Sequence, residues 1–144
     1  MLSQSHHDLV LTTPGRGFVD VTADLGSYLS QERAGDGLLT VFCTHTSASL
    51  LIQENADPTV RADLERFFSR LVRDGDAIYQ HTDEGPDDMS AHVRAALTQT
   101  HLAIPVKAGA LTLGRWQAVY LWEHRTSPHR RTLSLHYLGT VSAL

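Results

Sequence analysis

The last third of the chain contains short apolar or alternating segments with only a few residues between them. They span residues 102–106, 110–113, 117–123 and 131–138. The last one alternates strictly, with Leu133, Leu135 and Tyr137 on one face and polar side chains between them, as in a strand that buries one face. Segments this close together leave no room for crossover helices, so the pattern favours antiparallel strand pairing.

The first two thirds of the chain mixes strand and helix patterns. Residues 38–44 and 50–52 are apolar runs typical of buried strands. A helix is predicted to begin at Asp57-Pro58, because aspartate is a good N-cap and proline fits the first helical position. Helices are also predicted near residues 21–29 and 89–100.

Together these patterns predict an α+β fold. We expect a single compact domain over residues 1–144, built on a mainly antiparallel sheet with helices packed on one face. The length of 144 residues and the apolar fraction of 42% suit one domain with a real core.

Charge and composition exclude several classes of partner. The formal net charge is −4 and neither sign forms a long run, so we expect no nucleic-acid partner. The single cysteine, Cys43, rules out an intrachain disulfide. No apolar run reaches the roughly 20 residues of a membrane span, and the N-terminus has no apolar signal core. We therefore expect no membrane association and a cytoplasmic location.

Histidines and acids gather where chemistry is expected. The chain has nine histidines, a high number for its length. His45 follows a predicted buried strand, and the segment 81–92 holds two histidines and four acids. Such a density suits a divalent cation or a general acid–base pair, and it equally suits a solvated acidic loop. The spacing matches no standard zinc motif.

A second polar set surrounds the predicted strand 117–123. Gln117 and Glu123 are an even number of residues apart, so both are predicted on one face of that strand, with Arg125 joining them if the strand continues. An arginine fork can bind two oxygens of a phosphate or carboxylate, although a surface ion pair is the simpler explanation. Glu54 lies between an apolar run and a helix start, and capping does not account for it.

Three ordered blocks of residues resemble the YjbQ family, also called uncharacterised protein family 0047. The blocks are His45–Leu50 with Glu54–Arg61, then His81–His92, then Leu111–Gln117 with Glu123–Arg125. The resemblance covers about residues 15 to 139, and three blocks in the same order are far more specific than any single motif.

The resemblance implies a homotrimer with a polar site near the subunit boundaries. It also implies a secondary thiamine-phosphate synthase activity, which joins hydroxymethylpyrimidine diphosphate to a thiazole phosphate and releases pyrophosphate. The positions carried over from the family are His45, His81 and His92, with Glu54, Asp57, Asp88, Gln117, Glu123 and Arg125.

Our first hypothesis is an enzyme in which His45, His81 and His92 bind a divalent metal, zinc being the expected one. Arg125 would neutralise a small phosphorylated metabolite, and Glu54 or Asp88 would act as a base or support a ligand. The alternatives are a trimeric module that binds a metal ion or phosphorylated metabolite without turnover, and a purely structural trimer. In a purely structural trimer the three histidines should be scattered, whereas in a site they should converge.

Overall fold

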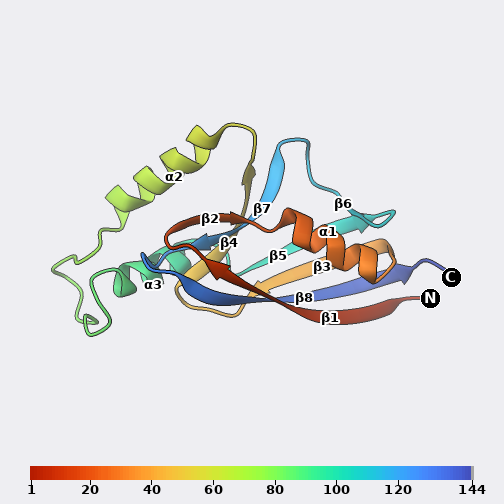
Figure 1. Ribbon diagram of the computed structural model, residues 1–144, viewed down its shortest axis with the longest axis horizontal. Coiled ribbons are helices and arrows are strands. Elements are labelled where there is room, and N and C mark those ends of the chain that lie inside the picture. Colours follow the sequence, from red (N-terminus) through yellow and green to blue (C-terminus); the bar gives the residue numbers. More distant parts are fainter. Residues whose placement is uncertain (144) are drawn as a thin grey trace.

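The computed structural model describes residues 1–143 (Figure 1). The strands are β1 (Ser3–Thr13), β2 (Gly17–Asp20), β3 (Ala34–Cys43), β4 (Ala48–Glu54), β5 (His101–Lys107), β6 (Ala110–Leu111), β7 (Gln117–Glu123) and β8 (His129–Val141). The helices are α1 (Thr22–Gln31), α2 (Pro58–Leu71) and α3 (Asp88–Leu97). No helix within residues 1–143 is long and apolar enough to cross a membrane.

All strand pairs are antiparallel, which confirms the predicted α+β class. The strands divide between two sheets, one ordered β1-β8-β3-β5-β6 and the other β2-β7-β4. The division arises because the chain leaves β6 and pairs β7 with β2 and β4 instead of with its neighbour in sequence. The two sheets and α1 enclose one core.

The alternation predicted for the last strand is confirmed. Leu133, Leu135 and Tyr137 of β8 are buried, and they face the core together with Leu39 and Val41 of β3. Burying one such leucine fully contributes about 1.5–3 kcal/mol, so this inner face supplies much of the stability of the domain.

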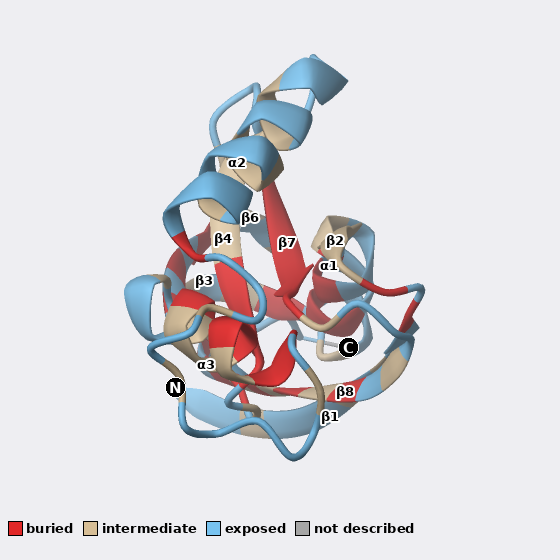
Figure 2. Cartoon of the chain, turned by 90° about the vertical axis from the view of Figure 1, so that its left-hand side faces the viewer, coloured by how far each residue is buried: buried red, intermediate tan, exposed pale blue. Residues whose placement is uncertain are grey.

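The opposite surface of the five-stranded sheet, here called the outer face, carries no helix. Figure 2 shows β1 and β8 at the bottom of the view, below all three helices. The outer face consists of Gln4, His6, Asp8 and Val10 on β1, Thr132, Ser134, His136 and Leu138 on β8, Leu38, Thr40 and Phe42 on β3, and His101, Ala103 and Pro105 on β5. Four of its large apolar side chains, Val10, Leu38, Phe42 and Leu138, are more than 40% exposed.

Helix α2 begins as predicted but packs less than its sequence indicates. Asp57 caps it by accepting a hydrogen bond from the Thr59 amide at 2.9 Å. None of its residues is buried, and Phe67 and Leu71 of its apolar stripe are more than half exposed. The stripe predicts an amphipathic helix, but it cannot show whether the rest of the same chain covers the apolar side.

Candidate metal centre

Three potential metal ligands converge at the start of α3. One ligand atom each from His81, Asp88 and His92 lies within 4.8 Å of the others, and we call these residues the ligand group. Asp88 and His92 are four residues apart on α3 and therefore share one helix face. His81 comes from the loop before α3, which turns back at Gly85, where φ is +102°.

Asp88 is the centre of the ligand group. Its side chain is only 2% exposed, and its Oδ2 lies 2.6 Å from Nε2 of His81 and 3.3 Å from Nε2 of His92. Its Oδ1 lies 3.0 Å from the Arg125 guanidinium. Burial alone would raise the pKa of Asp88, but hydrogen bonding with His81 and Glu84 lowers it, as do the charge of His92 when its ring is protonated and the charge of Arg125. The carboxylate is therefore ionised, as a metal ligand must be.

A backbone carbonyl fixes the orientation of His92. Nδ1 of His92 lies 3.0 Å from the carbonyl oxygen of Thr46, between β3 and β4. Because a carbonyl oxygen only accepts, Nδ1 carries a proton, and in the neutral ring Nε2 then presents its lone pair to the ligand group. Metal-binding histidines are commonly held in this way.

Arg125 ties the ligand group to the end of β7. Its Nε donates to Asp87 at 3.0 Å, and its Nη2 donates to the carbonyl of Glu84. Asp87 also accepts from the amide and hydroxyl of Thr126. Burial would raise the pKa of Asp87, but these hydrogen bonds and the Arg125 charge hold it well below its ordinary value.

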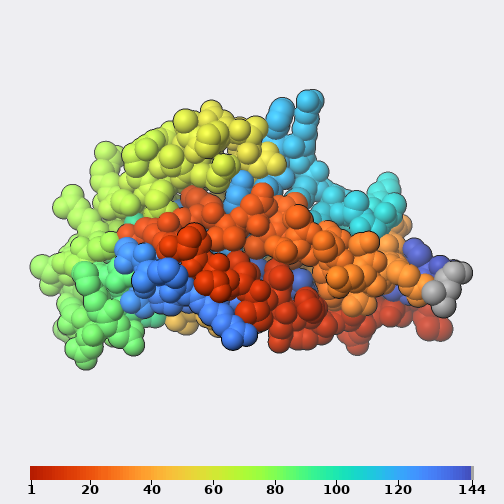
Figure 3. Space-filling model, in the orientation of Figure 1, coloured from red at the N-terminus to blue at the C-terminus, as the bar shows by residue number. Residues whose placement is uncertain are grey.

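Two carboxylates thus face one guanidinium, and the Glu84 carboxylate lies 3.8 Å from Nε2 of His81, so the net charge beside the two imidazoles is negative. In Figure 3 the green atoms of the loop before α3 lie beside the blue atoms of the turn after β7. The contacts therefore place the cation-attracting charge in one exposed corner of the molecule.

His45 lies beside the ligand group and not within it. Its Nε2 accepts a hydrogen bond from the amide of Thr132 at 2.8 Å. The His45 and His92 rings together line a hollow of about 290 Å³. The structure therefore brings His81 and His92 together with Asp88, and it places His45 beside this group, in the neighbouring hollow.

Glu123 lies in a buried ion pair. It is fully buried, and its two oxygens accept from Arg131 at 2.8 and 2.5 Å. Thr13 donates to the same carboxylate at 2.7 Å. Burial would raise the pKa of Glu123, but the hydrogen bonds from Arg131, Thr13 and the Arg125 amide lower it. With all these donors in place, Glu123 holds the structure around the site and does not face it.

Glu54 and Gln117 lie at the far end of the β4–β7 pair. They are opposite each other in register, six residues along β7 from Glu123. That separation corresponds to about 20 Å of strand. Each is engaged locally, since Glu54 accepts from the Asp57 amide and Gln117 accepts from the Gly114 amide. Within one chain neither residue reaches the ligand group, so their predicted catalytic roles stay predictions.

The sequence interpretation missed Asp87 and Arg131. Arg131 could have been found, because it occupies the same face of the alternating strand as Leu133 and Leu135. A charged residue at an inward position predicts a buried partner of opposite charge. Asp87 stands in an acidic run that gives no indication of which acid is buried.

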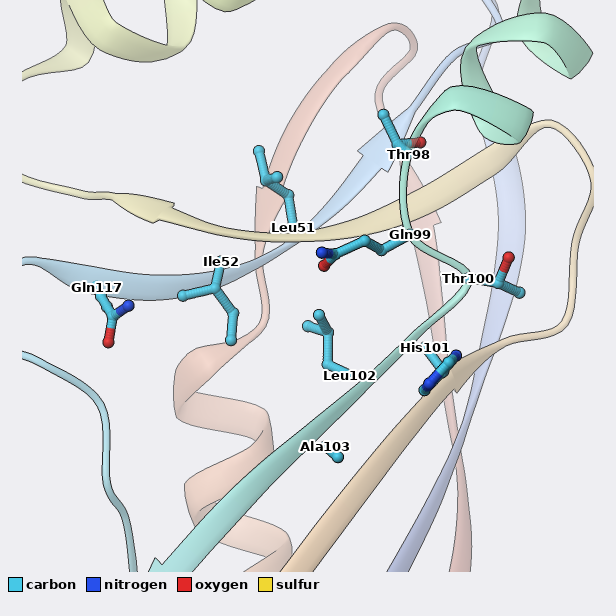
Figure 4. Close-up of a pocket in the computed structure, with 9 residues that line it drawn as sticks. All are labelled: Leu51, Ile52, Thr98, Gln99, Thr100, His101, Leu102, Ala103 and Gln117. Atoms are coloured by element: carbon cyan, nitrogen blue, oxygen red, sulfur yellow. The ribbon is translucent and has the colours of Figure 1, made fainter.

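A larger hollow lies elsewhere. Figure 4 shows it between β4 and the start of β5, with a volume of about 660 Å³. It is lined by Leu51, Ile52, Thr98, Gln99, Thr100, His101, Leu102, Ala103 and Gln117. No acid lines it and only Gln117 belongs to the predicted site, so its size alone does not make it the centre of the chemistry.

The fold and the ligand group together define a class of protein, a small α+β domain with a histidine and carboxylate centre. The family model described as UPF0047 protein YjbQ-like matches residues 7–140. The chain therefore belongs to the YjbQ (UPF0047) family. The UPF0047 protein sll1880 of Synechocystis sp. is 46% identical over 138 residues, which covers 96% of this chain and 94% of the relative.

Solved structures confirm the fold. The conserved hypothetical protein TT1486 of Thermus thermophilus superposes with a TM-score of 0.80 at 35% identity and covers 90% of this chain and 97% of its own. A YbjQ-like protein of unknown function from Sulfolobus solfataricus superposes with a TM-score of 0.87 over 97% of this chain and 100% of its own. At its 19% identity the second likeness shows the fold alone. None of these names states an activity.

The buried ion pair generates a first prediction. Arg131→Met leaves the Glu123 carboxylate buried without its counter-charge, so we expect the free energy of unfolding to fall by about 3–5 kcal/mol. The double variant Glu123→Gln with Arg131→Met removes the stranded charge and should lose less. Urea unfolding followed by circular dichroism measures both. A loss below about 1 kcal/mol in Arg131→Met would contradict the assigned role.

A second prediction concerns His124, which is fully buried with Nε2 2.8 Å from the Ser49 hydroxyl. Burial, followed by the charges of Arg94, Arg16 and Arg131, lowers the pKa of His124 to about 3. The unfolded chain, with a pKa near 6.5, therefore binds the proton first. The free energy of unfolding should fall as pH decreases below 6.5, by up to about 1.4 kcal/mol per pH unit.

The measurement is urea unfolding at several pH values between 7 and 5, where few carboxylates titrate. His124→Gln should show a shallower pH dependence than the protein without substitutions, while His7→Gln, at an exposed position away from the outer face, should keep the steep one. Equal slopes in all three proteins would exclude His124 as the source.

Proposed function

We propose that this protein binds a divalent cation, zinc, through His81, Asp88 and His92 and uses it to bind small phosphorylated metabolites. The observation that carries the proposal is the convergence of three ligand atoms within 4.8 Å around a buried carboxylate. The negative charge left by Asp87, Asp88 and Arg125 favours a cation at this place.

The donor set supports zinc. Two imidazoles and one carboxylate are a ligand combination that zinc takes in catalytic centres, where a fourth position is open to water or substrate. The bound cation would supply positive charge and Lewis acidity to a phosphate oxygen at that position. The carbonyl of Thr46 would keep the His92 ring oriented, and Arg125 would hold Asp88 in place.

The reaction we propose is a weak thiamine-phosphate synthase activity, which is the reaction that the family resemblance implies. A thiazole nitrogen would bond to the methylene carbon of hydroxymethylpyrimidine diphosphate, and the carbon–oxygen bond to the diphosphate would break and release pyrophosphate. Neutralising the leaving diphosphate is the main electrostatic task in such a transfer. Because Arg125 is already paired with two carboxylates, we assign it to positioning the ligand group and leave the neutralising charge to the cation.

The third prediction tests the metal. Protein purified without a metal-affinity tag should contain about one zinc per chain by elemental analysis. His92→Ala and Asp88→Asn should lose it, because each removes one of only three protein ligands. His7→Gln, at an exposed position outside the ligand group and the outer face, is the matched control and should keep its metal.

An unchanged protein that holds no metal would refute the proposal. A protein that holds zinc but releases no pyrophosphate from the two substrates would support the alternative, a binding module without turnover.

We also propose that the chain assembles as a homotrimer through the outer face. Leu38 and Leu138 are directly paired across β3 and β8, and Phe42 is paired with Ser134 and His101 on either side. Val10, Leu38, Phe42 and Leu138 are each more than 40% exposed on this face, and Asp8 is its only acid. Exposed apolar side chains that gather on one face of a molecule indicate a contact surface.

The fourth prediction is the size in solution. Light scattering after size-exclusion chromatography should give three times the chain mass of 15.9 kDa. Leu138→Asp should yield monomers, because it places a charge in the contact, whereas Leu71→Asp on α2 should stay trimeric. A measured mass of 15.9 kDa for the protein without substitutions would refute the assembly. Dissociation by Leu71→Asp but not by Leu138→Asp would place the interface at α2 instead.

A further inference from the structure

His45 is held in a defined protonation pattern by a single hydrogen bond. The amide of Thr132 donates to His45 Nε2 at 2.8 Å, and a backbone amide can only donate. Nε2 must therefore present its lone pair, so the proton of the neutral ring is on Nδ1. Within residues 1–143 no group accepts a hydrogen bond from this Nδ1–H.

This pattern is the opposite of the one in His92. In His92, Nδ1–H faces the Thr46 carbonyl and the lone pair of Nε2 faces the ligand group. In His45 the lone pair of Nε2 accepts from the Thr132 amide, and the Nδ1–H is the group available to a ligand. Binding a cation through Nδ1 would require the imidazolate form, because the other nitrogen is already an acceptor. His92 is thus prepared to be a ligand, and His45 is prepared to be a donor.

His45 also lines a hollow that adjoins the ligand group. His45 and His92 line this hollow of about 290 Å³ together with Thr46, Ala48, Ala95, Ala96 and Thr100. A second hollow of about 350 Å³ shares His45, Thr46 and Thr100 with it. No carboxylate lines either one. The hollows suit a small molecule with hydrogen-bond acceptors, and their size is at the lower end for ligand sites.

We infer that His45 is a neutral hydrogen-bond donor to an oxyanion, a phosphate or carboxylate, bound by the cation of the ligand group. The inference rests on the proposed function and names a recognition residue for its substrate. One oxygen of the ligand lies at the open position of the cation, and another accepts from His45 Nδ1–H. The alanine methyl groups leave room for the part of the ligand that carries the oxyanion.

The test separates cation binding from oxyanion binding. Zinc content is measured by elemental analysis, and the affinity of the zinc-loaded protein for inorganic phosphate is measured by calorimetry. His45→Leu should keep one zinc per chain and bind phosphate about 10- to 100-fold more weakly, as expected for loss of one hydrogen bond to a charged group. His45→Gln should recover part of the affinity, because its amide can accept from Thr132 and still donate.

His7→Gln, at an exposed position outside the ligand group and the outer face, is the matched control and should change neither quantity, and circular dichroism of each variant reports its folding. Loss of zinc from folded His45→Leu or His45→Gln would make His45 a metal ligand and overturn the inference. Full zinc with unchanged phosphate affinity in both variants would also overturn it while leaving the proposed function standing. An unchanged protein that binds no zinc would defeat both.

Discussion

The buried pair of Glu123 and Arg131 is the interaction on which the site depends. It joins the end of β7 in one sheet to β8 in the other, and Thr13 at the end of β1 donates to the same carboxylate. Arg131 also donates to the carbonyl and hydroxyl of Ser47, next to the carbonyl that orients His92. Glu123 accepts the amide of Arg125 as well. A pair that is costly to bury thus fixes both sides of the ligand group at once.

A second buried cation attaches the helix that carries the ligands. Arg94 of α3 is fully buried, and it donates to Glu65 and Ser69 of α2 at 2.5 and 3.2 Å. Glu65 also accepts from the indole of Trp122 on β7. Helix α2 therefore connects to the domain through polar bonds while its apolar stripe remains partly exposed. This arrangement explains how a helix without buried residues can still position α3.

The sequence predicted the elements better than it predicted their neighbours. The start of α2 follows from capping and proline placement, which are properties of adjacent residues, whereas no local pattern encodes which distant strand β7 joins.

The ligand group shows the same limit of local sequence patterns. His81 and His92 are expected from the density of histidines and acids, and the spacing of Asp88 and His92 on one helix turn would have allowed the third member to be chosen. The displacement of His45 depends on the Thr132 amide, 87 residues away along the chain, which only the paired strands bring to it.

The charge balance of the centre links cation binding to anion binding. The carboxylates of Asp87, Asp88 and Glu84 outnumber the one guanidinium, so the centre is negative, and the imidazoles add no charge while they are neutral. Without a cation this corner repels an oxyanion, although His45 offers a hydrogen bond nearby. A divalent cation offsets this negative charge, after which the metal and His45 attract the same ligand. Arg125 contributes to the balance by neutralising one of the acids, which leaves less negative charge for the dication to offset before an oxyanion binds.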